Sequence, residues 1–205
     1  MSNDTTTVAR LRAVIGEPDV TELAALREAL AARAEADGVL DVAYRTVDSP
    51  IGPLLVAATP VGLVRVAFER EGEDAVLAEL AAAVSPRILR SGRRTDAVAR
   101  ELDEYFARRR RRFDLPVDLQ LVHGFRHTVI AHLPEIPYGT TESYADVARA
   151  AGSPAAVRAV GTACGHNPVP IVVPCHRVVR SDGTIGQYRG GVEAKSALLA
   201  LEAAR

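Results

Sequence analysis

Residues 153–179 read SPAAVRAVGTACGHNPVPIVVPCHRVV, and they open with the pattern of a short helix. Serine followed by proline is a common helix start, because the serine side chain caps free N–H groups and proline tolerates the first helical position. Small and apolar residues then recur at helical spacing, and Gly165 can end the helix. The predicted inward face consists of Val157, Val160, Gly161 and Cys164, and the outward face has small residues around Arg158.

A second helix is predicted immediately before this one. Ser143 and Asp146 have the spacing of a capping box, in which each side chain bonds the other residue's backbone N–H. Tyr144 starts the helical pattern, and Gly152 supplies a stop. Two short helices joined by a tight turn predict a helix-turn-helix, and the small residues around Arg158 would let the second helix approach a groove closely.

Cys175 requires a separate explanation. The apolar, β-branched run Ile171–Val173 predicts a buried strand, which the following proline ends because it has no N–H to donate. The cysteine would then lie at the mouth of a strand, where His176 and Arg177 would favour the thiolate. These features indicate a nucleophile, although a buried cysteine is also a common small core residue. Cys164, inside a helical apolar stripe, fits that second description.

The N-terminal half shows other periodicities. Asp19 opens a helical pattern with Glu22 three residues later and leucines at 23, 26 and 30 along one face, and Gly38 ends it. The next residues predict an antiparallel meander of three strands within 42–46, 54–58 and 61–68, helices near 73–84 and 95–107, and a further strand at 113–119. We divide the chain into an extension with an amphipathic helix (1–38), an α/β domain (39–119) and a mostly helical domain (120–205).

The composition excludes several classes of protein. With 205 residues, the chain is long enough for one large domain or two small ones, each with a core. No apolar run approaches the ~18 residues of a membrane span and no secretory signal is present, so we expect no membrane and a cytoplasmic, reducing location. No Cys/His spacing suits zinc, so no metal is expected. The net charge of −1 does not itself indicate nucleic-acid binding, and the arginine run at 108–112 fits a solvated helix end better than a phosphate-contacting patch.

Residues 136–202 resemble the DNA alkyltransferases, also called methylated-DNA–protein-cysteine methyltransferases. The resemblance rests on PCHRV at 174–178, Asn167 upstream and Tyr-x-Gly-Gly at 188–191, a highly specific combination. Residues 49–68 resemble the family's N-terminal domain more weakly. The resemblance implies an α/β (α+β) fold, with an N-terminal ribonuclease-H-like antiparallel sheet domain and a C-terminal, mostly helical domain containing the helix-turn-helix. The chain departs from the family in having no tryptophan and in residues 1–38, which have no recognisable counterpart.

The resemblance also implies chemical roles. Cys175 would attack the alkyl carbon on O6 of guanine, His176 would take the thiol proton through a water, and Glu202 would orient the imidazole. Asn167, otherwise readable as an ordinary turn residue, would bridge the helix-turn-helix and the active-site strand. The product is a thioether, which has no carbonyl for water to attack, so each molecule would act once and without a cofactor.

The damaged base lies inside the duplex and must be rotated out before a buried thiol can reach it. The resemblance implies that Arg158 fills the vacated place from the minor groove, that Tyr144 presses on a neighbouring phosphate, and that Tyr188 bonds the extruded guanine. Without the resemblance, Tyr144 would be read as a core aromatic. The backbone at Cys175, Val178 and Arg189 would complete the base pocket, and Ala145, Ser153 and Ser181 fall at DNA-contact positions. Arg189 stands where smaller residues are common in the family.

The resulting prediction is direct reversal of O6-alkylguanine, and less well O4-alkylthymine, in double-stranded DNA by a monomer. Two other classes remain open. A helix-turn-helix lesion sensor or transcription regulator would bind alkylated DNA and leave its own mass unchanged. A cysteine hydrolase acting on a small acyl substrate would turn over repeatedly.

Overall fold

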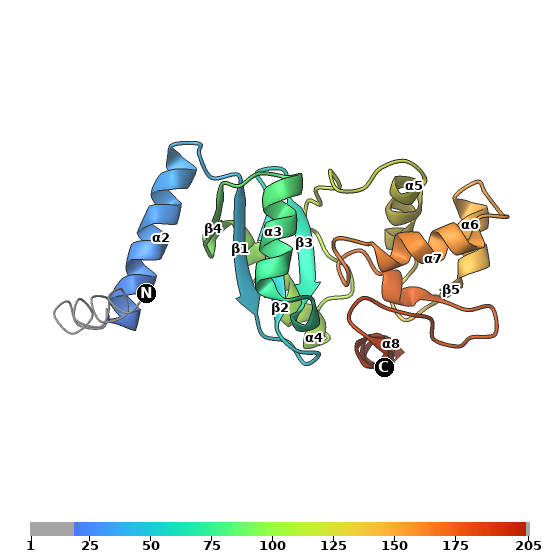
Figure 1. The fold of residues 1–205 in the computed structure, drawn as a ribbon. Helices are drawn as coiled ribbons and strands as arrows, with labels where there is room; N and C mark the ends of the chain where they lie inside the picture. The colour runs from blue at the N-terminus through green and yellow to red at the C-terminus, as the bar shows by residue number, and fades with distance from the viewer. Residues whose placement is uncertain (1–18, 204–205) are drawn as a thin grey trace, which may run out of the picture.

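In the computed structural model, which describes residues 19–203, the N-terminal half is built around a four-stranded sheet (Figure 1). Strands β1 (Val42–Val47), β2 (Leu54–Ala58) and β3 (Leu63–Phe68) form the predicted antiparallel meander. A fourth strand, β4 (Ile88–Arg90), pairs in parallel with β1 and gives the order β3-β2-β1-β4. The sheet is therefore mixed rather than purely antiparallel. A strand as short as β4 carries too little periodicity to be read from the sequence.

Helices cover both faces of this sheet. The short 3-10 helix η1 (Glu69–Glu71) leads into α3 (Glu73–Ala83), which packs on the face formed by Leu55 and Val64. After the 3-10 helix η2 (Arg93–Thr95), α4 (Asp96–Phe106) packs on the opposite face, where alternation along β2 places Leu54 and Val56. Both helices were predicted at nearly these positions. The cluster on the α4 side continues into the C-terminal half, so the two halves share one apolar core.

Helix α2 (Val20–Ala36) lies beside β4 at the edge of the sheet (Figure 1). Its predicted start is confirmed, because Asp19 Oδ1 accepts a hydrogen bond from the Thr21 N–H at 2.9 Å. The predicted apolar face is covered only in part: Leu23 is half-buried, Leu26 is 60% exposed and Leu30 58% exposed, while Ala31 is buried. Residues 1–18, the first part of the predicted extension, lie outside the described residues.

The C-terminal half is mostly helical. It contains α5 (Phe125–His132), the 3-10 helix η3 (Leu133–Glu135), α6 (Tyr144–Ala150), α7 (Val157–Gly165) and α8 (Val192–Ala203), with a two-stranded parallel pair of β5 (Glu142–Ser143) and β6 (Val178–Val179). The capping box is confirmed at the start of α6, where Ser143 Oγ accepts from the Asp146 N–H at 3.1 Å. The helices α6 and α7 pack against each other as the predicted helix-turn-helix.

Helix α7 begins later than predicted. The backbone oxygen of Ser153 accepts from Ala156 N at 2.8 Å, so Ser153 starts a turn rather than capping the helix. Because α7 starts at Val157, this residue lies at the open end of the helix and is 38% exposed, whereas it was predicted to face inward. Val160 and Cys164 are buried as predicted.

Two predicted strands are wrong. Residues 113–119 connect the two halves, and their strand-like pairing is limited to one bridge between Val117 and Leu63. Residues 171–173 are buried, but they form a tight loop in which Ile171 has a φ of 74° and Val173 N donates to Val169 O at 2.9 Å. Cys175 therefore begins a 3-10 helix, η4 (Cys175–Arg177), instead of following a strand.

Among the helices that the structure describes, none combines the length and apolar character needed to cross a membrane.

Candidate active site

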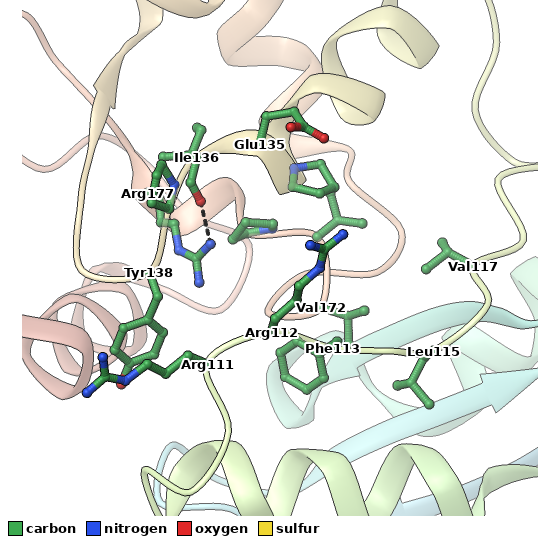
Figure 2. Close-up of a pocket in the computed structure, with 14 residues that line it drawn as sticks. Arg111, Arg112, Phe113, Leu115, Val117, Glu135, Ile136, Tyr138, Val172 and Arg177 are labelled. Atoms are coloured by element: carbon green, nitrogen blue, oxygen red, sulfur yellow. Dashed lines mark hydrogen bonds between the residues drawn. The ribbon is translucent and has the colours of Figure 1, made fainter.

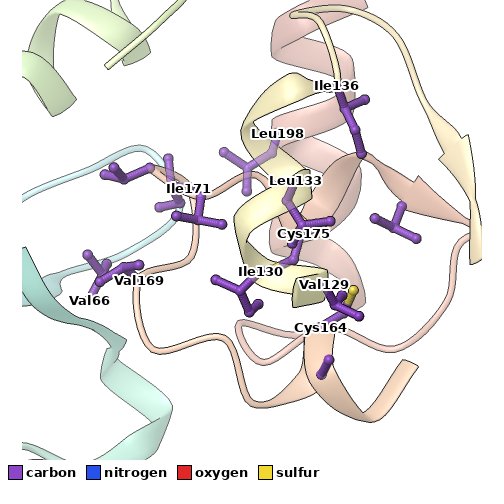
Figure 3. Close-up of a cluster of buried hydrophobic side chains, with 14 of the residues drawn as sticks. Val66, Val129, Ile130, Leu133, Ile136, Cys164, Val169, Ile171, Cys175 and Leu198 are labelled. Carbon is purple, nitrogen blue, oxygen red and sulfur yellow. The ribbon is translucent and has the colours of Figure 1, made fainter. Parts of the chain in front are cut away.

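Cys175 lies inside the C-terminal core, where it is 2% exposed (Figure 3). Asn167, in the loop after α7, donates from its side-chain amide to Cys175 Sγ at 3.1 Å and to Val173 O at 2.8 Å. The amide oxygen of Asn167 accepts from Val169 N at 3.1 Å. Because both ends of the amide are bonded, its orientation is fixed. The expected bridge from the helix-turn-helix to Cys175 thus has a geometric basis, although it spans a loop and not a strand.

The thiol of Cys175 is protonated at neutral pH. Burial raises the pKa of Cys175 to about 11, while the hydrogen bond from Asn167 and the charge of Lys195 act in the opposite direction with smaller effect. The prediction that His176 and Arg177 would favour the thiolate is wrong, because both side chains are directed at Glu202. A nucleophile in this environment needs a base that removes its proton during attack.

Glu202, on the buried face of α8, is the centre of the hydrogen-bond network beside the thiol. Its Oε1 accepts from Tyr105 OH at 2.7 Å, His176 Nε2 at 2.9 Å and Arg177 Nη2 at 2.9 Å. Its Oε2 accepts from Arg177 Nε at 2.9 Å and Gly139 N at 3.1 Å. Burial alone would raise the pKa of Glu202, but the bonds from His176 and Arg177 hold this pKa well below its usual range. The carboxylate is therefore charged and fully bonded.

His176 is suited to act as the base. A carboxylate can only accept, so the bond to Glu202 places the proton of the neutral ring on Nε2. The other ring nitrogen, Nδ1, is buried and has no hydrogen-bond partner among the described residues. Burial lowers the pKa of His176, although Glu202 opposes this effect. The imidazole is thus neutral at pH 7, with a free lone pair on Nδ1 and a negative charge behind it.

Lys195, the only lysine of the chain, was not singled out as a site residue. It is fully buried on α8, and its Nζ donates to Val178 O at 2.5 Å and lies 5.8 Å from the centre of the Tyr144 ring. The bond therefore engages the backbone of Val178, one of the positions at which the family resemblance assigns the backbone to the base pocket. Lys195, Leu198 and Glu202 recur at spacings of three and four residues and therefore lie on one face of α8. Because Leu198 is apolar, this pattern could have indicated that the lysine and the glutamate are buried with it.

A cavity of about 710 Å³ lies beside the helix-turn-helix. It is lined by Tyr144, Arg158, Gly161, Thr162, Gly165, His166, Arg180, Gly186, Gln187, Tyr188 and Arg189. The hydroxyl of Tyr188 is buried without a hydrogen-bond partner among the described residues, and its ring centre lies 6.5 Å from that of His176. Burial raises the pKa of Tyr188, and the negative charge of a Cys175 thiolate would raise it further. An unbonded hydroxyl thus lies near both the cavity and the thiol.

The structure brings together only some of the predicted DNA-binding positions. Tyr144, Arg158, Tyr188 and Arg189 line the same cavity. Four others do not line it: Ala145 and Ser153 are half-buried near the two ends of α6, Val178 is buried in β6, and Ser181 is exposed in the loop after β6. Arg158 is exposed on α7, as a residue that enters a DNA groove must be.

Cys164 shares the core with Cys175 but has a different environment (Figure 3). It lies on the inward face of α7, is 7% exposed, and burial raises the pKa of its thiol strongly. No general base is bonded near it in the described structure. Cys164 therefore fits the prediction of a core residue.

A second cavity, of about 380 Å³, is lined in part by residues 172–174, which lead into η4 (Figure 2). Arg177 borders it and donates from Nη1 to Ile136 O at 2.7 Å, which ties η4 to the segment after η3. Part of the arginine run also lies here: Arg111 stacks on the Tyr138 ring at 5.6 Å, while Arg110 pairs with Glu101, Glu104 and Asp114. These contacts indicate a structural role for part of the run.

No group of three or more His, Cys, Asp or Glu side chains within residues 19–203 could hold a metal ion.

Two family models match the chain. Residues 42–119 match the ribonuclease-like domain of 6-O-methylguanine DNA methyltransferase, and residues 124–204 match its DNA binding domain. A methylated-DNA–protein-cysteine methyltransferase of Mycolicibacterium paratuberculosis is 41% identical over 167 residues, which cover 78% of this chain and 92% of the relative. The protein of the same name from Mycobacterium tuberculosis H37Rv is 39% identical over 175 residues, with coverages of 79% and 93%.

Solved structures show the same similarity. The crystal structure of the Mycobacterium tuberculosis O6-methylguanine methyltransferase has a TM-score of 0.68 at 38% identity, and the match covers 80% of this chain and 94% of the other. A second crystal structure, of Mycobacterium tuberculosis OGT in complex with DNA, has a TM-score of 0.66 at 36% identity, with coverages of 78% and 92%.

Proposed function

The chain belongs to the methylated-DNA–protein-cysteine methyltransferase family, and from this premise we propose that it repairs O6-alkylguanine in double-stranded DNA by moving the alkyl group to Cys175. One observation carries the assignment of the acceptor. Cys175 is held by Asn167 at 3.1 Å and lies directly before His176, whose ring is bonded to the buried carboxylate of Glu202. A nucleophile, a base and a group that orients the base are the parts that such a transfer requires.

The transfer is an in-line displacement at the alkyl carbon. The sulfur of Cys175 forms the new S–C bond while the bond from this carbon to guanine O6 breaks, and guanine leaves with the electron pair. The thiol proton passes to Nδ1 of His176 through a water, and the imidazolium is stabilised by Glu202. A proton then returns to the departing guanine, so that the overall products are an S-alkyl cysteine and an unmodified guanine.

The buried site also supports the proposed order of events. Because the pKa of Cys175 is about 11, the thiol stays neutral until a base removes its proton. The alkylated guanine enters the cavity beside α7 after rotation out of the duplex, and the free hydroxyl of Tyr188 bonds to it. Arg158, exposed on α7, occupies the space left in the stack, and Tyr144 at the cavity wall presses on the adjacent phosphate.

The partner is DNA approached through the minor groove, and the protein acts as a monomer. The small residues next to Arg158 on α7 support a close approach to a narrow groove. We also place the activity in the cytoplasm, because its reducing conditions keep the two free cysteines as thiols. O4-alkylthymine would be the poorer substrate.

Two rival functions predict different products. A lesion sensor would bind the same DNA without needing a thiol held between Asn167 and a neutral imidazole. A cysteine hydrolase would release its product and repeat the cycle, whereas a thioether offers water no carbonyl to attack.

The test is the intact mass of the protein after incubation with a duplex that contains one O6-methylguanine. We expect the mass to rise by one methyl group per molecule, with the methyl group on Cys175 and none on Cys164. Cys175→Ser should bind the duplex without gaining mass, and Cys164→Ala should still be methylated. Unchanged mass, repeated turnover or methylation of Cys164 would each contradict the proposal.

A further inference from the structure

The N-terminal domain contacts the loop that carries the base-pocket residue Tyr188. Phe68, at the end of β3, meets the Tyr188 ring edge to face with 5.5 Å between ring centres. A side-chain carbon at Gly190 would lie 2.6 Å from the Phe68 ring, so only glycine allows this approach. The wall of the base pocket is thus packed directly against the other domain.

Glu71 is the polar centre of this contact. Its Oε2 accepts from Arg65 Nη2 at 2.5 Å and from Arg189 Nε at 2.5 Å, and its Oε1 accepts from Phe68 N at 2.9 Å. The carboxylate is 11% exposed and Arg65 is 1% exposed, so solvent screens these interactions little. One carboxylate therefore joins a buried arginine of the sheet to Arg189, the neighbour of Tyr188.

The same region has few other attachments. Residues 181–184 of the preceding segment are exposed, while Arg189 lines the cavity with Tyr188 and has a 26% exposed side chain. The bond to Glu71 and the packing of Phe68 consequently hold the Tyr188 loop from the N-terminal side, and Glu79 lies farther from Arg189, at 3.8 Å. Catalysis is sensitive to such placement, because an error of about 1 Å in a reacting group can cost ~100-fold in rate.

We propose that Glu71 is a positioning residue for alkyl transfer: it fixes Arg189, and with it the 188–190 loop, so that the Tyr188 hydroxyl faces the extruded base. Glu71 touches neither the base nor the thiol. This inference rests on the proposed function and assigns to the N-terminal domain a part in shaping the pocket of the C-terminal domain.

The experiment compares Glu71→Gln, Arg189→Gln and the double variant with Glu79→Gln as the matched control. Glu79 faces the same two arginines at 3.7 and 3.8 Å, but it is half exposed. Second-order rate constants are measured with an O6-methylguanine duplex and with free O6-benzylguanine, which needs no flipping. Duplex affinity is measured in a Cys175→Ser background, and folding by the thermal midpoint.

We expect each of the two single variants to slow both reactions by roughly ten- to 100-fold. Duplex affinity of Glu71→Gln should stay within about twofold. The double variant should transfer the alkyl group no more slowly than the slower single variant, because both changes break one contact. Glu79→Gln should react like the wild type, and Arg189→Lys, which keeps a cation near Glu71, should recover most of the rate lost in Arg189→Gln.

The inference would be overturned if the rate reductions of the two single variants multiplied in the double variant. It would also be overturned if the folded single variants transferred the alkyl group at the wild-type rate. If Glu71→Gln does not fold because Arg65 loses its partner, Arg189→Gln decides the matter, since it leaves the Arg65–Glu71 pair in place. Failure of the proposed function has another signature: the wild-type protein would then transfer no alkyl group from either substrate.

Discussion

Replacing Glu202 by glutamine should test how much the buried network beside Cys175 contributes to stability. The carboxylate accepts five hydrogen bonds, three on Oε1 and two on Oε2. A glutamine amide can accept at its oxygen, but its NH₂ group would face the donors on the other side. Glu202 is 1% exposed and Arg177 7%, so the variant would leave a buried guanidinium without its counter-charge.

The expected cost follows from that burial. Removing one partner of a buried ion pair typically destabilises a protein by about 3–5 kcal/mol. For a protein of this size, each kcal/mol lowers the unfolding midpoint by about 2–4 °C, so the shift should be roughly 6–20 °C. Thermal unfolding followed by circular dichroism measures it. Glu193→Gln is the matched control, because this residue lies exposed on the same helix and should shift the midpoint by less than about 1 °C.

The pH dependence gives a second, independent readout. The pKa of Glu202 is held well below its ordinary value of 4.5, so its stabilising contribution is complete above pH 4.5 and is lost as the pH falls through the folded-state pKa. The stability difference between the wild type and Glu202→Gln should therefore be constant near neutral pH and shrink in acid below about pH 4.5. A difference below about 1 kcal/mol at pH 7, or one that grows in acid, would refute the reasoning.

Three further predictions concern transfer. Arg158→Ala should slow transfer from duplex DNA by roughly one to three decades, because unstacking the base costs a few kcal/mol. Its rate with free O6-benzylguanine should be nearly unchanged. Equal slowing with both substrates would show that Arg158 supports the fold instead of base flipping. In His176→Gln the rate should rise about tenfold per pH unit between about pH 7 and 10, because the pKa of Cys175 is about 11. The wild type, whose His176 has a lowered pKa, should change little above pH 7, and parallel pH profiles would exclude His176 as the base. Removal of residues 1–38 should lower the unfolding midpoint, because the Glu35–Arg94 pair is lost. The transfer rate should stay within about twofold of the full chain. A truncated protein that is folded but inactive would contradict this.

Local patterns predicted the parts of the fold that local forces determine. Apolar runs separated by short turns predicted the meander of β1 to β3, and the Ser143–Asp146 capping box predicted the start of α6. The motif around Cys175 also led to the family correctly. Each of these signals lies within a few residues of the feature it predicts, so no knowledge of distant contacts was needed.

Where tertiary contacts decide the conformation, the sequence was misleading. Ile171–Val173 has the composition of a strand, yet these residues are buried because the loop is packed between the two halves, with Val66 N bonded to Pro168 O at 2.8 Å. Apolar β-branched residues report burial more reliably than strand pairing. The bonds from Arg189 to Glu71 and from Lys195 to Val178 connect residues 118 and 17 positions apart, and no periodicity encodes them.

The largest error of the sequence reasoning, the sign of the pKa shift at Cys175, bears directly on function. His176 and Arg177 follow Cys175 directly in the sequence, but the neutral imidazole and the guanidinium both bond to Glu202, and burial dominates at the thiol. With a pKa of about 11, only about one molecule in 10⁴ carries a thiolate at pH 7. Oxidants and alkylating agents in solution react with thiolates, so an acceptor that acts once is protected from them while it waits. In the proposed mechanism, the same burial makes transfer depend on an alkylated guanine that fills the pocket and on His176, which removes the thiol proton as the sulfur attacks. In that mechanism, selectivity for alkylated guanine therefore comes from a thiol that is unreactive at rest.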